Sequence, residues 1–475
     1  MRKTKIVCTI GPATDDEGIM RELMVSGMNV ARFNFSHGEY ETHKERFEMV
    51  EKLRNELGLP VATLLDTKGP EIRLGKFVDN KPVEIFDGDE YILTTEDVQC
   101  TNKIGSISFK NLPKDVGIGT RILINDGVIE LLAEKISGSE ITCRIIHGGI
   151  LSNNKGVNVP GVKLSMPYLS DRDMNDLEFG AKMKFDFIAA SFVRTAADIN
   201  YLRKFTQSLG WFDVRIIAKI ENLDGVENID EILEAADGIM VARGDMGVEI
   251  PFEQIPAIQK QLIHKGYNAG KQVITATQML ESMISNPRPT RAEITDVANA
   301  IYDGTSAIML SGETAAGAYP VEAVKTMALI AETTENNIDY KAEFSARRSE
   351  LNSSVAEAIA HATVTTAHDL NARAIITVSL CGQTARLISK YRPGCPIIGC
   401  TMSEVVCRQM NMSWGVLPFI IDEKTNTDDL FETAVEAAEQ RALVQTGDLV
   451  AITAGVPLGV SGTTNLMKVE KIGSK

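Results

Sequence analysis

The alternation of short apolar runs with amphipathic helical segments constrains the fold of this chain more than any other feature. Three strand-like runs precede residue 70, and five more follow residue 167, each of these five leading into a helical pattern. The runs are KIVCTI, NVARFNF and VATLLDT, then FDFIAASFV, VRIIAKIE, GIMVARGD, KQVITATQ and TSAIMLSGE. Helices are expected over Glu17–Val25 and Tyr40–Leu57. Since βα units build parallel sheets and eight of them close a ring, we predict an α/β fold, a (β/α)8 TIM barrel.

Two further segments differ from this rhythm. Between residues 71 and 167 the sequence is rich in glycine, with short alternating runs and no helix-length periodicity, which is typical of all-β structure. From residue 340 a second βα pattern begins, with a helix over residues 354–368, the strand AIITVS, a helix from Thr384 and the strands PIIGC and DLVAIT. The polar connection 336–352 marks a domain boundary. We expect a barrel domain (1–70 and 168–339), an inserted β-barrel lid domain (71–167) and a C-terminal doubly wound α/β domain (340–475).

Charge and hydropathy argue against several classes of protein. A net charge of −15 opposes contact with phosphate backbones, so no nucleic-acid partner is expected. No apolar run approaches the roughly 20 residues of a membrane span, and the N-terminus lacks a secretory signal pattern. We expect a cytoplasmic enzyme without a membrane partner. Small anionic substrates are still possible if metal ions or local arginines offset the negative charge of the protein.

Polar side chains stand at the carboxyl ends of six of the eight predicted strands, where TIM barrels carry their chemistry. Any one of them could be a surface residue that closes a strand, but six together are hard to obtain from surface solvation. In strand order they are Arg32, Asn34 and Ser36; Asp66 and Thr67; Lys219 and Glu221; Arg243, Gly244 and Asp245; Thr275 and Thr277; Ser311 and Glu313.

The tripeptide KIE, residues 219–221, is the most informative of these strand ends. A lysine beside a carboxylate most often forms a structural ion pair, but the next strand delivers Asp245 to the same mouth. Two carboxylates, completed by substrate oxygens and water, form an all-oxygen site that suits Mg²⁺ or Mn²⁺. Lys219 would then be a fixed cation that stabilises an oxyanion or a phosphoryl group in transfer.

Six motifs resemble those of pyruvate kinases, over essentially the whole chain. They are VARFNFSHG, LLDTKGPEIR, KIEN, MVARGDMGVEIP, TATQMLESM and IMLSGETAAGAYP. The resemblance implies transfer of the phosphoryl group of phosphoenolpyruvate to ADP, giving pyruvate and ATP, the last step of glycolysis. It also implies a barrel with a lid and a C-terminal regulatory domain, and a homotetramer.

The resemblance assigns roles to the strand-end residues. It implies that Arg32 and Lys219 contact the transferring phosphoryl group and that Glu221 and Asp245 bind the divalent metal. The substrate carboxylate would meet the backbone at Gly244 and Asp245 together with Thr277. Thr277 and Ser311 would belong to the polar network that protonates the enolate.

Further positions match the monovalent-ion and nucleotide sites of the family. Residues that match K⁺ ligands are Asn34, Ser36, Asp66 and Thr67, and residues that match the nucleotide side are Pro12, His37, Arg73 and Lys155. Members that need K⁺ carry glutamate at the position of Glu71, whereas K⁺-independent members carry lysine, whose ammonium replaces the ion. We therefore expect K⁺-dependent activity.

Two other functions remain open at this point. A metal-dependent aldolase or lyase would also stabilise an enolate with Mg²⁺, although the lid lysine and the DTKGPEIR motif favour the kinase. A non-catalytic metabolite-binding protein would be expected to have lost Lys219, Glu221 or Thr277, and all three are present. The chain has no GxxxxGK[ST] loop, which excludes one common mode of ATP binding.

The motif TVSLCGQTARL places Ser379, Gly382 and Thr384 between a strand and a helix. These residues could form an ordinary helix cap, or they could bind a phosphate at the helix N-terminus. Resemblance to allosteric pyruvate kinases favours a phosphorylated effector here, with the loop GVPLGVSGTTN closing over it. Leu380 and Gln383 bring no charge, so we expect a monophosphate, such as ribose 5-phosphate or AMP, rather than fructose 1,6-bisphosphate.

Overall fold

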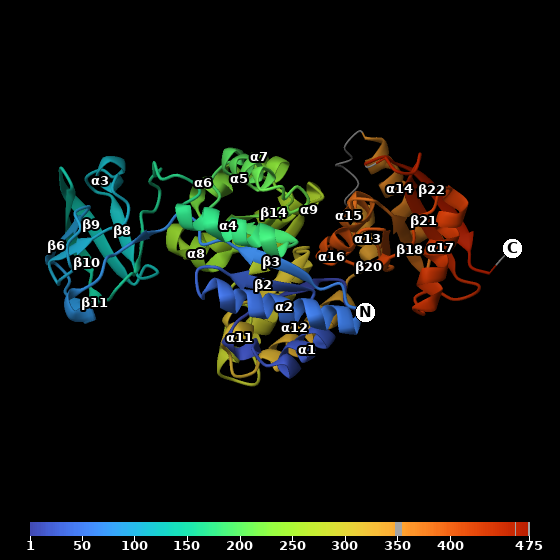
Figure 1. The fold of residues 1–475 in the computed structure, drawn as a ribbon, viewed down its shortest axis with the longest axis horizontal. Helices are drawn as coiled ribbons and strands as arrows, with labels where there is room; N and C mark the ends of the chain where they lie inside the picture. Colours follow the sequence, from blue (N-terminus) through green and yellow to red (C-terminus); the bar gives the residue numbers. More distant parts are fainter. Residues whose placement is uncertain (347–353, 461, 474–475) are drawn as a thin grey trace.

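A barrel, an inserted β part and a C-terminal α/β part lie in a row in a computed structural model that describes residues 1–346, 354–460 and 462–473. Figure 1 shows the barrel in the centre, the inserted β structure on the left and the C-terminal α/β structure on the right. The inserted and C-terminal parts therefore contact different regions of the barrel. Among the described residues, no helix has both the length and the apolar character needed to cross a membrane.

The central part is the closed, eight-stranded parallel barrel that the sequence predicts. Its strand order around the ring is β1-β17-β16-β15-β14-β13-β3-β2. The strands are β1 (Lys5–Ile10), β2 (Val30–Asn34), β3 (Ala62–Asp66), β13 (Phe187–Ala190), β14 (Arg215–Ile220), β15 (Gly238–Ala242), β16 (Gln272–Ala276) and β17 (Ala307–Leu310). Three precede the insertion and five follow it, as the βα rhythm indicates.

Helices cover the outside of this barrel. They are α1 (Glu17–Ser26), α2 (Tyr40–Leu57), α4 (Asp171–Met183), α5 (Ala196–Ser208), α6 (Leu223–Glu227), α7 (Ile229–Ala235), α8 (Arg243–Glu249), α9 (Ile255–Asn268), α10 (Arg291–Tyr302), α11 (Gly312–Ala315) and α12 (Pro320–Glu335). Local interactions explain where α1 begins and where α2 ends. The Asp16 carboxylate accepts a hydrogen bond from the Ile19 amide at 2.9 Å to begin α1, and Gly58, with φ of 63°, ends α2.

The barrel interior is a packed core, and this decides where a site can lie. Every strand contributes at least one fully buried apolar side chain to one cluster, among them Val30, Leu64 and Ile217. Met412, from the C-terminal part, completes the same cluster, so that part covers one end of the barrel. The carboxyl ends of the strands stay open at the other end, which is the functional face of this fold.

The inserted segment forms one mixed seven-stranded sheet in the order β4-β12-β8-β9-β10-β6-β7, and a two-stranded sheet of β11 and β5. An isolated bridge between Leu74 and Ile107 joins the two ends of the larger sheet, which therefore curls toward the expected barrel. One helical turn, α3 (Leu112–Asp115), lies within it. The strands are β4 (Ile72–Arg73), β5 (Val83–Ile85), β6 (Glu90–Thr94), β7 (Ile104–Ser106), β8 (Arg121–Ile124), β9 (Ile129–Ser137), β10 (Glu140–His147), β11 (Gly149–Leu151) and β12 (Gly156–Asn158).

The C-terminal part is a five-stranded sheet with helices on both faces. Its order is β20-β19-β18-β21-β22, parallel except for the antiparallel edge strand β22. Alternate strand residues enter two separate cores: Ile375 packs with α14 and α15, and Ile376 packs with α17. The elements are α13 (Tyr340–Ala346), α14 (Val355–Asp369), β18 (Ala374–Val378), α15 (Gln383–Lys390), β19 (Ile397–Thr401), α16 (Glu404–Met410), β20 (Val416–Ile420), α17 (Thr427–Gln440), β21 (Leu449–Gly455) and β22 (Thr464–Lys471). Of the expected linker 336–352, residues 347–352 lie outside the described part.

Polar contacts attach this C-terminal part to the amino end of the barrel. Asn411 donates to the carbonyl oxygens of Asn29 and Pro60, at 3.1 and 2.8 Å, and Arg408 Nε lies 2.8 Å from the buried carboxylate of Asp186. Lys5, on β1, donates to the Val416 carbonyl at 2.6 Å. The two parts are thus joined by buried and partly buried hydrogen bonds as well as by Met412.

Candidate active site

Arg32 and Asp66 form a buried pair at the open end of the barrel. Arg32 Nε lies 2.6 Å from Asp66 Oδ2, and Arg32 Nη1 donates to the Thr9 hydroxyl at 2.8 Å. Burial alone would raise the pKa of Asp66, but Arg32 and Lys219 outweigh it and hold the pKa below its usual value. Asp66 is therefore an anion that fixes the direction of the Arg32 guanidinium.

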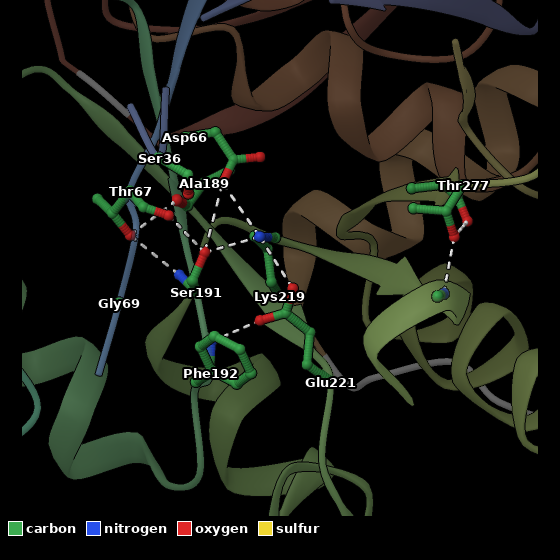
Figure 2. Close-up of polar contacts among 12 residues, drawn as sticks. Ser36, Asp66, Thr67, Gly69, Ala189, Ser191, Phe192, Lys219, Glu221 and Thr277 are labelled. Carbon is green, nitrogen blue, oxygen red and sulfur yellow. Dashed lines mark hydrogen bonds and ion pairs between the residues drawn. The ribbon is translucent and has the colours of Figure 1, made fainter. Parts of the chain in front are cut away.

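Lys219 lies at the centre of the site, as Figure 2 shows. Its Nζ is 2.7 Å from the Ser191 hydroxyl, 3.1 Å from Asp66 Oδ1 and 2.9 Å from Glu221 Oε1. Burial opposes the charged ammonium, but the carboxylates of Asp66 and Glu221 outweigh it and raise the pKa of Lys219. The side chain is consequently a fixed cation, not a proton donor near neutral pH.

Glu221 is fully buried and only partly satisfied. The Phe192 amide donates to its Oε2 at 2.7 Å, whereas Oε1 accepts no hydrogen bond within the described residues and has only the ion pair with Lys219. Burial, and then the charge of Asp245, raise the pKa of Glu221 to about 8, against the opposing effect of Lys219. A carboxylate oxygen without a hydrogen-bond donor, beside a second carboxylate, favours a cation at this position.

Asp245, in the first turn of α8, is the second carboxylate. It is exposed on the wall of a cleft of about 460 Å³. Within the described ranges no group of three or more His, Cys, Asp and Glu side chains is arranged to hold a metal ion. Glu221 and Asp245 are thus two carboxylates that could hold a metal ion, and further ligands would have to come from substrate or water.

Gly244 and Thr277 meet between the neighbouring strands β15 and β16. The Gly244 amide donates to Thr277 Oγ1 at 2.8 Å, and that hydroxyl donates to the Ala276 carbonyl at 2.6 Å. Thr277 has φ of 69°, a strained conformation for a β-branched residue. Arg243 donates to the Thr277 carbonyl at 2.6 Å and lies 2.7 Å from Asp296, so its contacts hold this strained turn in place.

The predicted K⁺ ligands occupy the ends of β2 and β3. Asn34 Oδ1 accepts from the Ser36 amide at 3.1 Å, and the Thr67 hydroxyl lies 3.3 Å from the Ala189 carbonyl. Asp66 belongs to the network around Lys219. These residues offer oxygen atoms, which are suitable donors for a hard monovalent cation.

The predicted nucleotide residues are distributed unevenly. His37, Arg73 and Lys155 line the same cleft as Asp245, between the barrel and the inserted sheet. Pro12 is exposed on the turn after β1 and is outside the described lining of that cleft. Ser311 ends β17, where its amide donates to the buried Glu313 at 2.7 Å, and no described hydrogen bond joins it to Thr277.

Most of the chain matches family models and curated proteins of known activity. The family model "Pyruvate kinase, barrel domain" matches residues 1–324, and "Pyruvate kinase, alpha/beta domain" matches residues 357–470. The pyruvate kinase of Clostridium acetobutylicum is 49% identical over 99% of this chain and 100% of its own length. That of Geobacillus stearothermophilus is 50% identical over 99% of this chain and 80% of its own.

A solved structure of a pyruvate kinase from Cryptosporidium parvum superposes with a TM-score of 0.93, at 41% identity, over 99% of this chain and 96% of that one. The chain belongs to the pyruvate kinase family. As a pyruvate kinase it transfers the phosphoryl group of phosphoenolpyruvate to ADP in glycolysis.

Sequence reasoning missed two residues that support this pyruvate kinase site, and it did not foresee the contacts of a third. Ser191 and Phe192 follow β13, the one later strand whose end was given no role, and both contact the Lys219–Glu221 pair (Figure 2). The sequence did contain a signal for Ser191, because a serine directly after an apolar strand is another polar side chain at a strand end. Arg243 was noted as a strand-end residue, but its contacts with Thr277 and Asp296 could not be read from the sequence.

The predicted effector residues lie near a small cavity in the C-terminal part. Ser379 and Thr384 line a space of about 60 Å³, and Gly382, with φ of 72°, caps α15. The Thr384 hydroxyl is 2.7 Å from that of Thr464. The lining also includes Lys424, a cation from a distant loop that the sequence motif did not reveal. In the covering loop, residue 461 lies outside the described part.

Proposed function

We propose that Arg32 and Lys219 bind the phosphoryl group of phosphoenolpyruvate during its transfer to ADP. The single observation that carries this assignment is the position of Lys219 Nζ, within 3.1 Å of oxygens of Asp66, Glu221 and Ser191. Fixed cations stabilise charge that develops in the transition state, because they need no reorganisation as the reaction proceeds. Arg32, oriented by Asp66 and Thr9, supplies the second positive charge.

We assign the divalent metal to Glu221 and Asp245. The donor set fits, since Glu221 Oε1 lacks a hydrogen-bond donor and both groups offer the oxygen ligands that hard cations prefer. When bound, Mg²⁺ or Mn²⁺ would supply a Lewis acid that withdraws negative charge from substrate oxygens.

The turn at Gly244 and Thr277 is assigned to the substrate carboxylate. The Thr277 hydroxyl holds its proton toward the Ala276 carbonyl at 2.6 Å, so it must rotate before it can donate to a substrate. We place Thr277 and Ser311 in the network that protonates the enolate. His37, Arg73 and Lys155, which share the cleft with Asp245, are assigned to the phosphates of ADP, while Pro12 is assigned to the nucleotide on family resemblance alone.

Activity with and without metal tests these assignments. Pyruvate formation, coupled to a dehydrogenase, should require both ADP and Mg²⁺ or Mn²⁺ in the unaltered enzyme. Glu221→Gln and Asp245→Asn should each abolish metal-dependent turnover, because each removes one of only two anionic ligands. Turnover that is undiminished at low Mg²⁺ in both variants would refute the metal site.

K⁺ is assigned to Asn34, Ser36, Asp66 and Thr67. Glu71, which lies 2.6 Å from Arg73 and 3.6 Å from Lys68, is the residue whose identity separates the K⁺-requiring members of the family. Rates in buffers of K⁺ or a bulky organic cation should differ widely, and Glu71→Lys should narrow the difference. Equal rates in the two buffers for the unaltered enzyme would exclude a K⁺ requirement.

An effector with one phosphate is assigned to the loop of Ser379, Gly382 and Thr384. Lys424 adds a positive charge to the lining of this cavity, and the carboxylate of Glu423 in the same lining opposes it, so the assignment rests on the family resemblance. Titration with ribose 5-phosphate and AMP at low phosphoenolpyruvate should raise the rate in the unaltered enzyme but not in Thr384→Asp. No response to either compound would leave the loop as a helix cap.

We also propose the domain division, the oligomeric state and the cellular location that are expected from the sequence. The enzyme is assigned three domains, covering 1–70 with 168–339, 71–167 and 340–475. The division is supported by the strands, since no sheet contains strands from more than one of these domains. A homotetramer and a cytoplasmic location are proposed from the family and its glycolytic role. Sedimentation of the purified enzyme would test the oligomer.

A further inference from the structure

His43 is buried and has no part in the catalytic assignments, although it lies against the loop that carries His37. It is the fourth residue of α2 and is only 4% exposed. Side chains of a helix lean back toward its amino end, so His43 can reach the residues that precede α2. Its Nε2 lies 2.8 Å from the carbonyl oxygen of His37, an exposed residue that lines the cleft. A buried imidazole thus contacts the backbone of the cleft wall.

This contact determines which nitrogen of His43 carries the proton. A carbonyl oxygen can only accept a hydrogen bond, so Nε2 is the donor and Nδ1 is the nitrogen without a proton. Burial lowers the pKa of His43, and the hydrogen bond to His37 opposes this effect. The ring is therefore neutral at pH 7, and its single N–H is directed to the His37 carbonyl.

Packing alone does not explain a histidine at this position. The ring stacks on Phe35, with centroids 4.3 Å apart and an angle of 14° between the planes, and Phe33 approaches it edge-on at 6.3 Å. Nδ1 is buried and has no hydrogen-bond partner within the described residues. A buried polar atom without a partner is unfavourable, and an apolar side chain would avoid it. The hydrogen bond from Nε2 is thus the contribution that an apolar side chain could not make.

The loop against His43 is held along its whole length. The Ser36 amide donates to Asn34 Oδ1 at 3.1 Å, and the His37 amide donates to the Asn34 carbonyl at 3.3 Å. Gly38, with φ of 85°, passes so close to His43 that a Cβ there would lie 3.1 Å from Nε2. The His43 hydrogen bond therefore fixes the orientation of the peptide group between His37 and Gly38.

The His37 side chain depends on this backbone for its direction. It is exposed, and in the described part of the chain its ring has no hydrogen bond or ion pair of its own. It shares the cleft with Arg73 and Lys155. A change in the peptide group at His37 would therefore move the ring relative to these two cations.

We propose that His43 is a positioning residue: its Nε2–H holds the His37 carbonyl and thereby directs the His37 side chain toward the phosphates of ADP. The inference rests on the proposed function, in which His37 binds those phosphates. His43 does not line the cleft and acts only through the loop. Loss of its N–H should raise KM for ADP and leave kcat and KM for phosphoenolpyruvate nearly unchanged, since Lys219 contacts Asp66, Glu221 and Ser191 instead.

Two substitutions of His43 separate the hydrogen bond from the stacked ring. His43→Met and His43→Gln both lose the stacking on Phe35 and both suit a helix, but only the glutamine has a terminal N–H that can reach the His37 carbonyl. His43→Met should raise KM for ADP about fivefold, whereas His43→Gln should stay within about twofold of the unaltered enzyme.

The matched control is His264→Met, because His264 is an exposed helical histidine whose ring contacts Asn268 on the same helix, α9. It should leave both KM values unchanged. Equal rises in KM for ADP in His43→Met and His43→Gln, or an equal rise in KM for phosphoenolpyruvate, would overturn the proposal. If His43→Met does not fold, His43→Asn replaces it, since its shorter side chain is polar but does not reach the His37 carbonyl.

His37→Ala distinguishes this inference from the proposed function. It should itself raise KM for ADP, and His43→Met should add little in that background, because His43 acts through His37. If His37→Ala leaves KM for ADP unchanged, the nucleotide role of His37 and the positioning role of His43 are both wrong. If His37→Ala raises it and His43→Met does not, only the positioning role is wrong.

Discussion

At the scale of single residues, the site depends on charges that are buried together and that hold one another in place. Asp66 contacts both Arg32 and Lys219, and Lys219 also contacts Glu221. Removal of one member leaves its partner as an uncompensated buried charge, which costs several kcal/mol in typical cases. A substitution of any one of them therefore removes its own charge and also changes the position and protonation of its neighbours.

Lys219→Met should lower kcat far more than it raises KM for phosphoenolpyruvate. The ammonium group matters most as negative charge develops, so the expected loss in kcat is on the order of 10³-fold. The pKa of Glu221 should also rise further, because Lys219 is the group that opposes burial there. Steady-state kinetics with the coupled assay measure both constants. A rise in KM at unchanged kcat would limit the lysine to substrate binding.

Ser191→Ala should lower kcat by about tenfold while the protein stays folded. Its hydroxyl accepts a hydrogen bond from Lys219 at 2.7 Å and donates one to the Thr67 carbonyl at 2.6 Å, so it positions the ammonium group. The substitution removes only this hydroxyl and leaves the apolar core of the barrel unchanged. The pH profile of kcat should shift as well, because Lys219 and its carboxylate partners lose a fixed contact. Ser191→Thr, which keeps the hydroxyl, is the rescue control. Equal losses in the two variants would point to crowding rather than a lost hydrogen bond.

At the scale of elements, strand β12 of the inserted sheet is joined to helix α8 of the barrel. Asn158 Nδ2 donates to Glu249 Oε1 at 3.1 Å, and α8 also carries Asp245. Burial raises the pKa of Glu249, and the hydrogen bond from Asn158 opposes that rise. This contact closes one side of the cleft that also includes Arg73 and Lys155.

Asn158→Ala should raise KM for ADP about fivefold and change kcat little, because one hydrogen bond across the cleft contributes about 1 kcal/mol. The control is Asn153→Ala, which removes two hydrogen bonds within the inserted part, to Asn80 at 3.0 Å and from the Phe77 amide at 2.7 Å. A double-mutant cycle with Glu249→Gln measures the coupling directly. Equal effects of the Asn158 and Asn153 substitutions would show that only the stability of the inserted sheet had changed.

The elements themselves were well predicted, because their signals are local. Helix α2 spans Tyr40–Leu57 as expected, since its amphipathic pattern ends at a glycine suited to a left-handed cap. All eight barrel strands were located from apolar runs. The contacts that complete the site are not local: Ser191 and Lys219 are 28 residues apart, and the charge of Lys424 reaches the cavity beside Thr384 from a separate loop. No spacing rule in the sequence joins such pairs.

At the scale of the whole molecule, the C-terminal and inserted parts lie on opposite sides of the barrel (Figure 1), and a cleft separates the inserted part from the carboxyl ends of the strands. Met412 enters the barrel core, and Asn411 bonds two barrel carbonyls. The sequence predicted the two α/β parts but not this junction, because it consists of backbone carbonyls and side chains from distant segments. The same junction holds a buried lysine, Lys5.

Lys5 gives the junction a dependence on pH. Burial, and then the charge of Arg2, lower the pKa of Lys5 to about 7, whereas an unfolded chain keeps it near 10.5. Between these values the unfolded chain binds more protons than the folded one, so the free energy of unfolding rises as pH increases from 7 toward 10.5. By linkage, the full effect is about 4–5 kcal/mol, with the penalty greatest at and below pH 7.

Lys5→Met should therefore stabilise the protein at pH 7, and its advantage over the unaltered chain should shrink steadily as the pH rises toward 9. The lost hydrogen bond to Val416 offsets only about 1 kcal/mol of this gain. Denaturant unfolding at several pH values measures the free energy of unfolding of both proteins. In the difference between the two values, the titration of all other groups cancels. Lys204→Met, on the exposed side of α5, is the control and should show no such trend. Parallel curves for Lys5→Met and the unaltered chain would mean that Lys5 stays charged at the junction.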